Sequence, residues 1–303
     1  MKLQQTTPEF RAGGTDLSER RRSGISRGDI VDLAPSDAMS GIAWGPQGAA
    51  RIGALVTIET LAGDARVQAA YPGLAAAAAG LATPQIRSVG TLGGNLAQWT
   101  RCWYFRNPHL ACLKKGAPVC PAREGNHLYG VAFDLGPCVA PHPSTLAAAL
   151  LAYDATVTTS ERSSLTIAAL LGDGTDGTAD NTLVPGESIT HIDMPAPLAL
   201  ERAGYRRAIG RASAEWPLVE VVVRAVIAQQ RLEFIRVAAG GIATVPLRFP
   251  VVEDALRSAA FDEAAIRRAA ALAAKNAKPL PGTAYKLKLL EQEIVDVVQS
   301  LVN

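Results

Sequence analysis

SVGTLGGNL (Ser88–Leu96) is a glycine-rich stretch with apolar residues on both sides. Because glycine has no Cβ, the backbone N–H groups of such a stretch can approach an anion closely, and its threonine and asparagine add hydrogen bonds. The spacing is not that of a Rossmann GxGxxG, and no Gly-Lys-Ser/Thr follows as in a Walker A loop. Taken alone, the stretch is better explained as an ordinary tight turn.

A second glycine pair stands in RAGGTDL (Arg11–Leu17), near the start of the chain. It also lacks the Rossmann and Walker spacings. Two such loops in one α/β region favour a shared ligand that carries phosphate. Residue composition alone takes this inference no further.

The residues between and after these loops predict alternating strands and helices. RIGALVTIETL (Arg51–Leu61) begins as an apolar, β-branched run typical of a strand, and Thr57 can cap the helix that follows. An alanine-rich helix must end by Thr83, because the residue before a proline is disfavoured in the α region. HPSTLAAALLAYDATVTT (His142–Thr159) predicts a helix, capped by Ser144 or Thr145, that leads into a strand.

The last third of the chain has a different pattern. ITHIDMP (Ile189–Pro195) predicts a strand, and the apolar runs Val219–Ile227 and Leu232–Ala239, joined by a short polar link, predict a β-hairpin. Helical patterns follow at residues 251–258, 262–277 and 286–301. We therefore expect a domain boundary near residue 198, followed by an antiparallel sheet backed by helices.

The composition excludes some classes of protein. The chain has 303 residues, 48% of them apolar, and a formal net charge of +2, so no basic field indicates nucleic-acid binding. The run ERRR (Glu19–Arg22) is expected to be a solvated loop. The N-terminus has no apolar h-region of a secretory signal, and the longest apolar stretch, Leu74–Ala82, is too short to span a bilayer. We expect a soluble, cytoplasmic protein without a membrane span.

All four cysteines of the chain lie in one window, at Cys102, Cys112, Cys120 and Cys138. In the cytoplasm, clustered cysteines favour metal or redox chemistry over disulfides. No two are as close as the ligand pairs of a zinc finger, although His109, His127 and His142 leave a mixed zinc site open. Separate cysteines in an irregular loop suit a cuboidal iron–sulfur cluster, in which each thiolate binds a different iron. Cysteines without any metal are the remaining alternative.

Basic side chains flank the cysteines in the sequence. Those that would offset the negative charge of a thiolate-ligated cluster are Arg101, Arg106, Lys114 and Lys115. No Ser/His/Asp or Cys/His constellation is recognisable elsewhere, and no pair of carboxylates stands at catalytic spacing. A chain with cofactor loops but no evident acid, base or nucleophile is typical of an electron-transfer module.

Several motifs occur here in the order that they have in one family. They are AGGTDL, RIGALVTIETLA, TPQIRSVGTLGGNLAQ, CVAPHPSTLAAALLAYDA and LPGTAYK. In these motifs the chain resembles the FAD-binding medium subunit of the molybdenum hydroxylases, the group of xanthine dehydrogenase, carbon monoxide dehydrogenase and bacterial aldehyde oxidoreductases. RCWYFR, the spaced cysteines and the pair Asn126–His127 are most similar to the subgroup with an inserted [4Fe–4S] cluster.

The resemblance implies an α+β fold in two domains. The first, residues 1–198, would be a vanillyl-alcohol-oxidase-like (PCMH-type) FAD-binding domain, with an iron–sulfur insertion at about 101–138. The second, residues 199–303, would be a C-terminal α+β domain with an antiparallel sheet.

The resemblance also implies roles for individual residues. The loop that would wrap the FAD pyrophosphate is formed by Ala12, Gly13, Gly14, Thr15, Asp16 and Leu17. A second phosphate or ribityl contact would come from Thr91, Gly94 and Asn95. Ile189 would lie near the isoalloxazine ring, and Arg206 would stand where the family has a lysine near the flavin. The cluster ligands would be Cys102, Cys112, Cys120 and Cys138.

Three departures from the family pattern bear on flavin binding. The family has a strand–helix unit before AGGTDL, where this sequence has only a short segment. The aspartate of the family's HPSD motif, a flavin contact, is Thr145, and the lysine is Arg206. These departures predict weaker or altered FAD binding.

The resemblance implies an electron-transfer subunit. A large partner subunit with molybdopterin would oxidise an aldehyde or aromatic heterocycle, and a small partner with [2Fe–2S] clusters would pass electrons to FAD in this chain. The flavin would deliver them to an external electron acceptor. The alternatives are a degenerate structural subunit without FAD and, in a different class, a stand-alone flavoprotein oxidase. Export to the periplasm together with a partner is the alternative to the cytoplasm.

Overall fold

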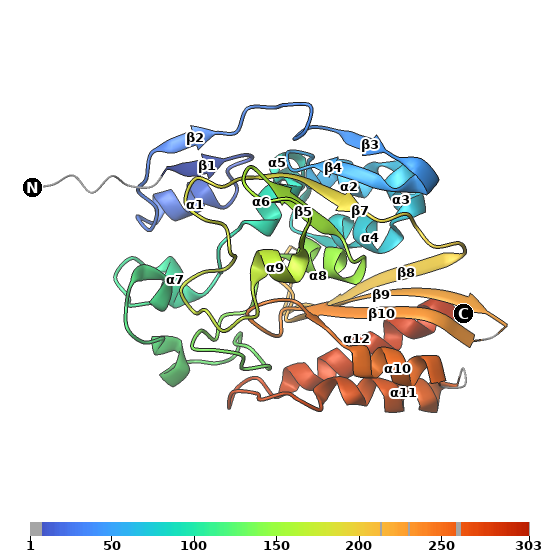
Figure 1. Ribbon diagram of the computed structural model, residues 1–303. Coiled ribbons are helices and arrows are strands. Elements are labelled where there is room, and N and C mark those ends of the chain that lie inside the picture. Colours follow the sequence, from blue (N-terminus) through green and yellow to red (C-terminus); the bar gives the residue numbers. More distant parts are fainter. Residues whose placement is uncertain (1–7, 213, 230, 259–261, 303) are drawn as a thin grey trace, which may run out of the picture.

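The computed structural model describes residues 8–212, 214–229, 231–258 and 262–302 (Figure 1). The described residues form a five-stranded, a four-stranded and a two-stranded sheet, together with helices that lie on and between them. None of these helices combines the length and the hydropathy that a membrane span requires.

The five-stranded sheet is antiparallel throughout, in the order β3-β4-β7-β5-β6. Its strands are β3 (Ile42–Trp44), β4 (Ala50–Gly53), β5 (Thr156–Thr159), β6 (Leu165–Thr166) and β7 (Ile189–Met194). Ala50 pairs with Met194, so the two strands predicted from apolar runs more than a hundred residues apart are neighbours in this sheet. The antiparallel sheets and mixed helices confirm the α+β class.

The helices of this part are α2 (Ile58–Gly63), α3 (Ala65–Ala70), α4 (Pro72–Gly80), α5 (Pro84–Val89), α6 (Leu92–Leu96), α8 (Thr145–Ala152) and α9 (Ile167–Leu171). Two of them, α2 and α8, begin at predicted capping residues. Thr57 accepts a hydrogen bond from the backbone N–H of Thr60 at 3.1 Å, and Ser144 accepts one from Ala147 at 3.1 Å. Each side chain satisfies an N–H that has no partner inside the helix. Ser144, rather than Thr145, is therefore the cap of α8.

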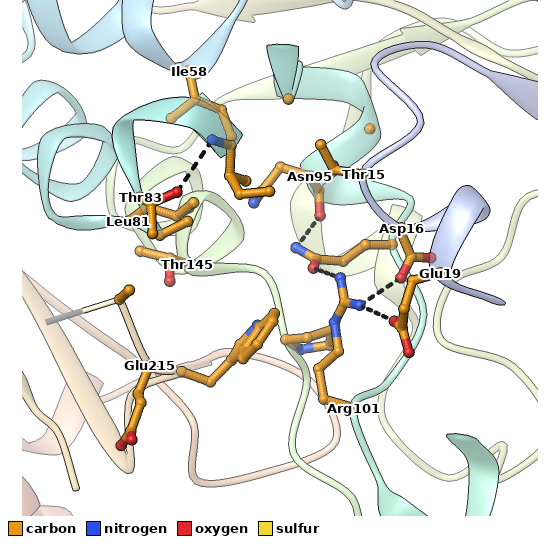
Figure 2. Close-up of a pocket in the computed structure, with 18 of the residues that line it drawn as sticks. Thr15, Asp16, Glu19, Ile58, Leu81, Thr83, Asn95, Arg101, Thr145 and Glu215 are labelled. Carbon is orange, nitrogen blue, oxygen red and sulfur yellow. Dashed lines mark hydrogen bonds and ion pairs between the residues drawn. The ribbon is translucent and has the colours of Figure 1, made fainter. Parts of the chain in front are cut away.

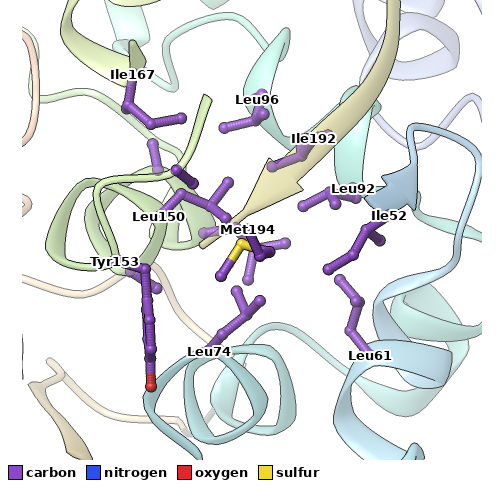
Figure 3. Packing of buried hydrophobic residues seen from close by; sticks show 14 of the residues in the cluster. Ile52, Leu61, Leu74, Leu92, Leu96, Leu150, Tyr153, Ile167, Ile192 and Met194 are labelled. Atoms are coloured by element: carbon purple, nitrogen blue, oxygen red, sulfur yellow. The ribbon is translucent and has the colours of Figure 1, made fainter. Parts of the chain in front are cut away.

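One apolar core fixes the second glycine stretch in place. Figure 3 shows Leu92 and Leu96 of α6 among side chains from the sheet and from α8, including Ile192 and Leu150. All four are fully buried. Burying a leucine or isoleucine side chain contributes about 1.5–3 kcal/mol, so displacing α6 would cost several times that amount.

The four-stranded sheet lies between two layers of helices. It runs in the order β11-β10-β9-β8 and consists of β8 (Glu201–Ala208), β9 (Val219–Ala228), β10 (Arg231–Gly240) and β11 (Leu247–Arg248). One face is covered by α10 (Pro250–Ser258), α11 (Glu263–Ala271) and α12 (Tyr285–Val302), and α4 and α8 contact the other face (Figure 1). The predicted hairpin at Val219–Ala239 and the final helices are confirmed.

The two faces of β9 belong to different cores. Val222 packs into the core beneath the glycine stretches, whereas Val221 and Val223 pack into the core under α10, α11 and α12. A strand that is buried on both faces must be apolar at consecutive positions, which explains its unbroken valine run.

The N-terminal segment corrects one prediction. β1 (Glu9–Arg11) and β2 (Ile30–Asp32) form a parallel pair, and α1 (Leu17–Arg22) lies between them in the chain. The run Glu19–Arg22, expected to be a solvated loop, belongs to this helix. The Arg20 side chain is only 12% exposed because it forms ion pairs with Glu9 at 3.0 Å and with Asp16 at 3.1 Å.

The cysteine segment, residues 101–138, is irregular, as expected for a loop that carries separate cysteines. It contains α7 (Trp103–Arg106) and the single turns η2 (Leu113–Lys115) and η3 (Pro121–Glu124); the other such turns are η1 (Pro46–Gly48) and η4 (Leu272–Ala274). The segment lies beside α1 and the loop that leads into it (Figure 1).

Candidate functional site

The fold brings the two glycine stretches into direct contact. A Cβ atom on Gly13 would lie 1.8 Å from the carbonyl oxygen of Val89, so only glycine lets the first loop lie on the second. Gly14 has a φ of +70°, a conformation that other residues rarely adopt. The second stretch is held from beneath, because Ile58 donates a backbone hydrogen bond to Gly90 at 2.9 Å.

A cavity of about 610 Å³ opens beside this contact, and we call it the first cavity. Its volume lies in the range of small-molecule and cofactor sites. The glycine stretches line it with Thr15, Asp16, Gly90, Thr91, Gly94 and Asn95, and the rest of the chain adds Arg101, Thr145, Arg207 and Trp216. Six residues predicted as flavin contacts therefore lie around one space: Thr15, Asp16, Thr91, Gly94, Asn95 and Thr145.

Asp16 lies at the centre of a charged network on one wall of the first cavity (Figure 2). Its carboxylate is 2.8 Å from Arg101, 2.7 Å from Arg106 and 3.1 Å from Arg20. Glu19 pairs with Arg101 and Arg106 at 3.0 and 2.5 Å. Burial alone would raise the pKa of Asp16, but Arg101 and Arg106 lower it below its ordinary value. The two carboxylates on this wall are thus paired with cations.

Asn95 connects the second glycine stretch to the start of α8. Its Oδ1 accepts a hydrogen bond from the hydroxyl of Ser144 at 2.6 Å, and Asn95 is nearly buried. Because Ser144 also caps α8, this contact fixes the position of Thr145, the next residue, at the cavity wall.

Strand alternation places Arg207, rather than Arg206, at the first cavity. Successive side chains of a strand point to opposite faces. Arg206 points toward α12, where it pairs with Glu293 at 3.0 Å and with Asp296 at 3.2 Å. Arg207 lines the cavity together with Thr145. The cation of β8 that lines the first cavity is therefore Arg207, the residue next to the predicted Arg206.

The remaining predicted contacts are not among the described residues that line the first cavity. Ile189 is 5% exposed and packs in the core of the five-stranded sheet. Leu17 is also buried, and Ala12, Gly13 and Gly14 belong to the loop whose next two residues line the cavity. These residues shape the loop and the sheet behind it.

Sequence reasoning missed a buried carboxyl beside Thr145. Glu220 of β9 accepts a hydrogen bond from the hydroxyl of Tyr205 at 3.0 Å and is also hydrogen-bonded to Thr145. Burial raises the pKa of Glu220 to about 7, although these two hydrogen bonds oppose the shift. In the sequence Glu220 is a single charge within a valine run, and that irregularity was the only available signal.

Arg101 and Arg106 also have a role that the sequence did not indicate. They were expected to balance the charge of a cluster, but the structure pairs them with Asp16 and Glu19. Nothing within one sequence links residues so far apart. The start of the cysteine segment is thereby attached to the first glycine loop.

The four cysteines are free thiols that lie near one another. Burial raises the pKa of Cys102, of Cys112 and, to about 11, of Cys138, and a charge on Cys120 would raise each of them further. Cys120 therefore lies within electrostatic reach of the other three. Among the described residues, no group of three or more His, Cys, Asp or Glu side chains could hold a metal ion. This finding removes support for a mixed zinc site with the nearby histidines.

The first cavity offers what a phosphate-bearing cofactor requires. Gly94 is exposed at the wall, and Arg207 adds a cation. The Nε of Arg101 is buried without a hydrogen-bond partner in the described part of the chain, so a donor remains for a ligand. An unpaired buried donor costs about 1–3 kcal/mol, which an oxygen acceptor would offset. The residues present fit FAD.

Comparison with known proteins agrees with this geometry. Residues 2–197 match the family described as "FAD binding domain in molybdopterin dehydrogenase", and residues 204–299 match the "CO dehydrogenase flavoprotein C-terminal domain". The chain is 33% identical to the aldehyde oxidoreductase FAD-binding subunit PaoB of Escherichia coli over 259 residues, which are 83% of this chain and 80% of that protein. It is also 40% identical to a xanthine dehydrogenase FAD-binding subunit of Escherichia coli O157:H7 over 86 residues, 28% of this chain and 30% of the relative.

Solved structures share the fold. A chain of carbon monoxide dehydrogenase from Hydrogenophaga pseudoflava superposes with a TM-score of 0.75 at 21% identity, covering 97% of this chain and 89% of that one. A chain of quinoline 2-oxidoreductase from Pseudomonas putida 86 gives a TM-score of 0.75 at 18% identity, covering 98% and 90%. The family match covers more than half of this chain, and PaoB aligns with it over most of both sequences. This chain therefore belongs to the family of FAD-binding subunits of molybdenum hydroxylases.

Proposed function

We propose that this chain is the flavin-carrying, electron-transfer subunit of a heteromeric molybdenum-dependent hydroxylase, with FAD bound in the first cavity. The observation that carries the proposal is the meeting of the two glycine stretches at one cavity wall. This wall also keeps a buried donor on Arg101 that is unpaired among the described residues. When bound, FAD supplies the ability to accept single electrons and to release one or two.

The residues of this chain would bind and orient the cofactor. The loop from Ala12 to Leu17 would wrap the pyrophosphate, and Thr91, Gly94 and Asn95 would form the second phosphate or ribityl contact. Thr145 and Arg207 would lie near the flavin ring, with Arg207 in place of the lysine of the family. A cation there favours an anionic, reduced flavin electrostatically.

We also propose that Cys102, Cys112, Cys120 and Cys138 ligate a [4Fe–4S] cluster. The support is the position of Cys120 within electrostatic reach of the other three thiols. In a cuboidal cluster each thiolate binds a different iron, so its ligands stand farther apart than those around a single ion. A site of this kind is compatible with the absence of a single-ion site among the described side chains. The cluster would extend the electron relay or hold the cysteine segment together.

The remaining features of the proposal follow the family. The complex would contain a large molybdopterin subunit that oxidises an aldehyde or aromatic heterocycle and a small [2Fe–2S] subunit; the relative aligned over most of this chain is named for aldehyde oxidoreduction. The FAD-binding domain would be of the PCMH type and span residues 1–198, followed by a second domain at 199–303. The complex would act in the cytoplasm, unless a partner exports it.

The experiment is an absorbance spectrum and a metal analysis of the complex purified with its partners. Flavin near one equivalent per chain, with molybdenum and with iron in excess of the [2Fe–2S] content, is the expected result. The second candidate is a structural subunit that has lost FAD, motivated by Thr145 where the family has an aspartate. An intact complex without flavin would establish that candidate, and zinc on the four thiols without excess iron would refute the cluster.

A further inference from the structure

A second cavity, of about 410 Å³, lies between the cysteine segment and the four-stranded sheet. It shares part of its wall with the first cavity, namely Arg101, Trp103, Pro143, Glu215, Trp216 and Pro217. The guanidinium of Arg101 lies over the ring of Trp216 at 4.7 Å from its centroid. Both of these stacked side chains line the two cavities.

Three buried titratable side chains from different elements line the second cavity. Glu220, His142 and Lys286 line it and are between 1 and 4% exposed. All three approach one stretch of backbone, residues 240–243. Glu220 is the partner of Gly240 in the β9–β10 ladder, His142 donates its backbone N–H to Ala243, and Lys286 reaches Gly241.

His142 presents a donor for which the described residues provide no acceptor of ordinary hydrogen-bond geometry. Its Nδ1 accepts a hydrogen bond from the backbone N–H of Ser144 at 3.2 Å. Burial lowers the pKa of His142 to about 4, so the ring is neutral and its proton is on Nε2. Nε2 is buried and has no hydrogen-bond partner within the described residues; the backbone of Asp180 lies near enough to favour the protonated ring but makes no hydrogen bond of ordinary geometry.

Lys286 likewise keeps unused donors. Its Nζ donates to the carbonyl oxygen of Gly241 at 2.7 Å, the single acceptor that the described residues provide for a group with three N–H bonds. Burial lowers the pKa of Lys286 to about 7 and raises that of Glu220 to about 7, so near neutral pH the two groups give the cavity no large net charge. The donors therefore suit oxygen acceptors on an uncharged ligand.

The outer part of the second cavity is aromatic. Trp103, Tyr129 and Trp216 line it and are 61%, 49% and 51% exposed, and Trp103 and Tyr129 form an edge-to-face pair with centroids 5.7 Å apart. Exposed aromatic faces at the mouth of a cavity favour a planar ring.

We propose that the second cavity binds a quinone, an uncharged planar ring whose carbonyl oxygens accept hydrogen bonds from His142 and Lys286. Binding requires nothing of the first cavity. The role that we assign to the ligand, the external electron acceptor of the complex, rests on the proposed function. A quinone takes up two electrons and one proton on each carbonyl oxygen to give a hydroquinone, the electrons coming from the reduced flavin across the shared wall and the protons from water.

The test is a titration of the full-length chain with duroquinone, a fully methylated benzoquinone to which thiols do not readily add. Tryptophan fluorescence quenching and calorimetry report binding without any turnover. We expect saturable binding of one molecule per chain. His142→Phe and Lys286→Met should each weaken it about tenfold, since each removes one hydrogen-bond donor. Circular dichroism shows whether each variant is folded. If His142→Phe does not fold, the binding affinity of Lys286→Met alone decides the test.

Arg207→Met is the matched control, because Arg207 lines the first cavity and not the second. It should weaken FAD binding and leave duroquinone binding unchanged. The site would be overturned by a lack of saturable binding to the unmodified chain, or by donor variants that both bind as tightly as the unmodified chain. Benzoate binding in place of duroquinone with the same dependence on His142 and Lys286 would also overturn it, in favour of an anion. Duroquinone binding in a chain that never takes up FAD would support the site and refute its role as acceptor site.

Discussion

The two cavities share a wall, yet their polar groups are arranged in opposite ways. Along the first cavity, Asp16 and Glu19 are paired with arginines, so most charges are satisfied within the chain, although the Nε of Arg101 has no partner among the described residues. In the second cavity, His142 and Lys286 are buried with donors that the described residues do not use. Paired groups stabilise the fold itself, whereas unused buried donors cost stability that a ligand can offset. Substitutions in the first wall should therefore destabilise the chain, and substitutions in the second should stabilise it.

The largest effect is expected for Gly13→Ala. The new Cβ would meet the carbonyl oxygen of Val89 at 1.8 Å, and neither the Cβ, which is fixed to the backbone, nor the backbone carbonyl can rotate away. We expect a loss of about 3 kcal/mol or more in the free energy of unfolding and no measurable FAD binding. Urea denaturation and a flavin titration measure both. Gly63→Ala is the control, since no described atom lies within 4 Å of its Cβ position. An equal loss of stability in that variant would show that the clash with Val89 is not the cause.

Arg106→Leu should destabilise the chain by about 3 kcal/mol, because it leaves Asp16 and Glu19 partly unpaired at a buried wall. It also removes hydrogen bonds of 2.8 and 2.7 Å to the carbonyl oxygens of Thr100 and Trp99. Arg11→Leu, which breaks the exposed ion pair with Asp32, should change the unfolding free energy little. Similar losses in the two variants would contradict the view that burial gives the Arg106 pairs their importance.

Lys286→Met should instead stabilise the chain, by about 2 kcal/mol at pH 6. Burial lowers the pKa of Lys286 in the folded chain to about 7, below its value of about 10.5 in the unfolded chain. The burial cost of the ammonium is therefore complete below pH 7, and it declines as the pH rises from 7 toward 10.5. The stability difference between variant and unmodified chain should shrink over that range. Chemical denaturation at pH 6 and pH 9 measures it, and a constant difference would show that Lys286 does not titrate there.

The smallest effect distinguishes two adjacent arginines. Arg207→Met should weaken FAD binding about tenfold, or about 1.4 kcal/mol, because it removes a cation from the first cavity. Arg206→Met changes a side chain that is half exposed and pairs with α12, so FAD affinity should stay within about twofold. Flavin fluorescence titrations give both dissociation constants. If Arg206→Met weakened FAD binding more than Arg207→Met, Arg206 would be the flavin contact.

Much of the fold could be predicted because its signals are local. The caps at Thr57 and Ser144 are read from residues next to the helices that they start, and the hairpin at Val219–Ala239 from two apolar runs and a short link. The glycine stretches were recognisable for the same reason. Each depends on interactions within a few residues, which one sequence displays directly.

The sequence by itself determined the order of the elements, the two glycine stretches and the gathering of the cysteines. Only the tertiary structure decided that Arg101 and Arg106 pair with Asp16 and Glu19, that Arg207 and not Arg206 faces the first cavity, and that Glu220, His142 and Lys286 line one cavity. These contacts join residues far apart in the chain, and a shift of one position in a strand turns a side chain to the other face. Their energies depend on burial, which exists only once the layers have packed together.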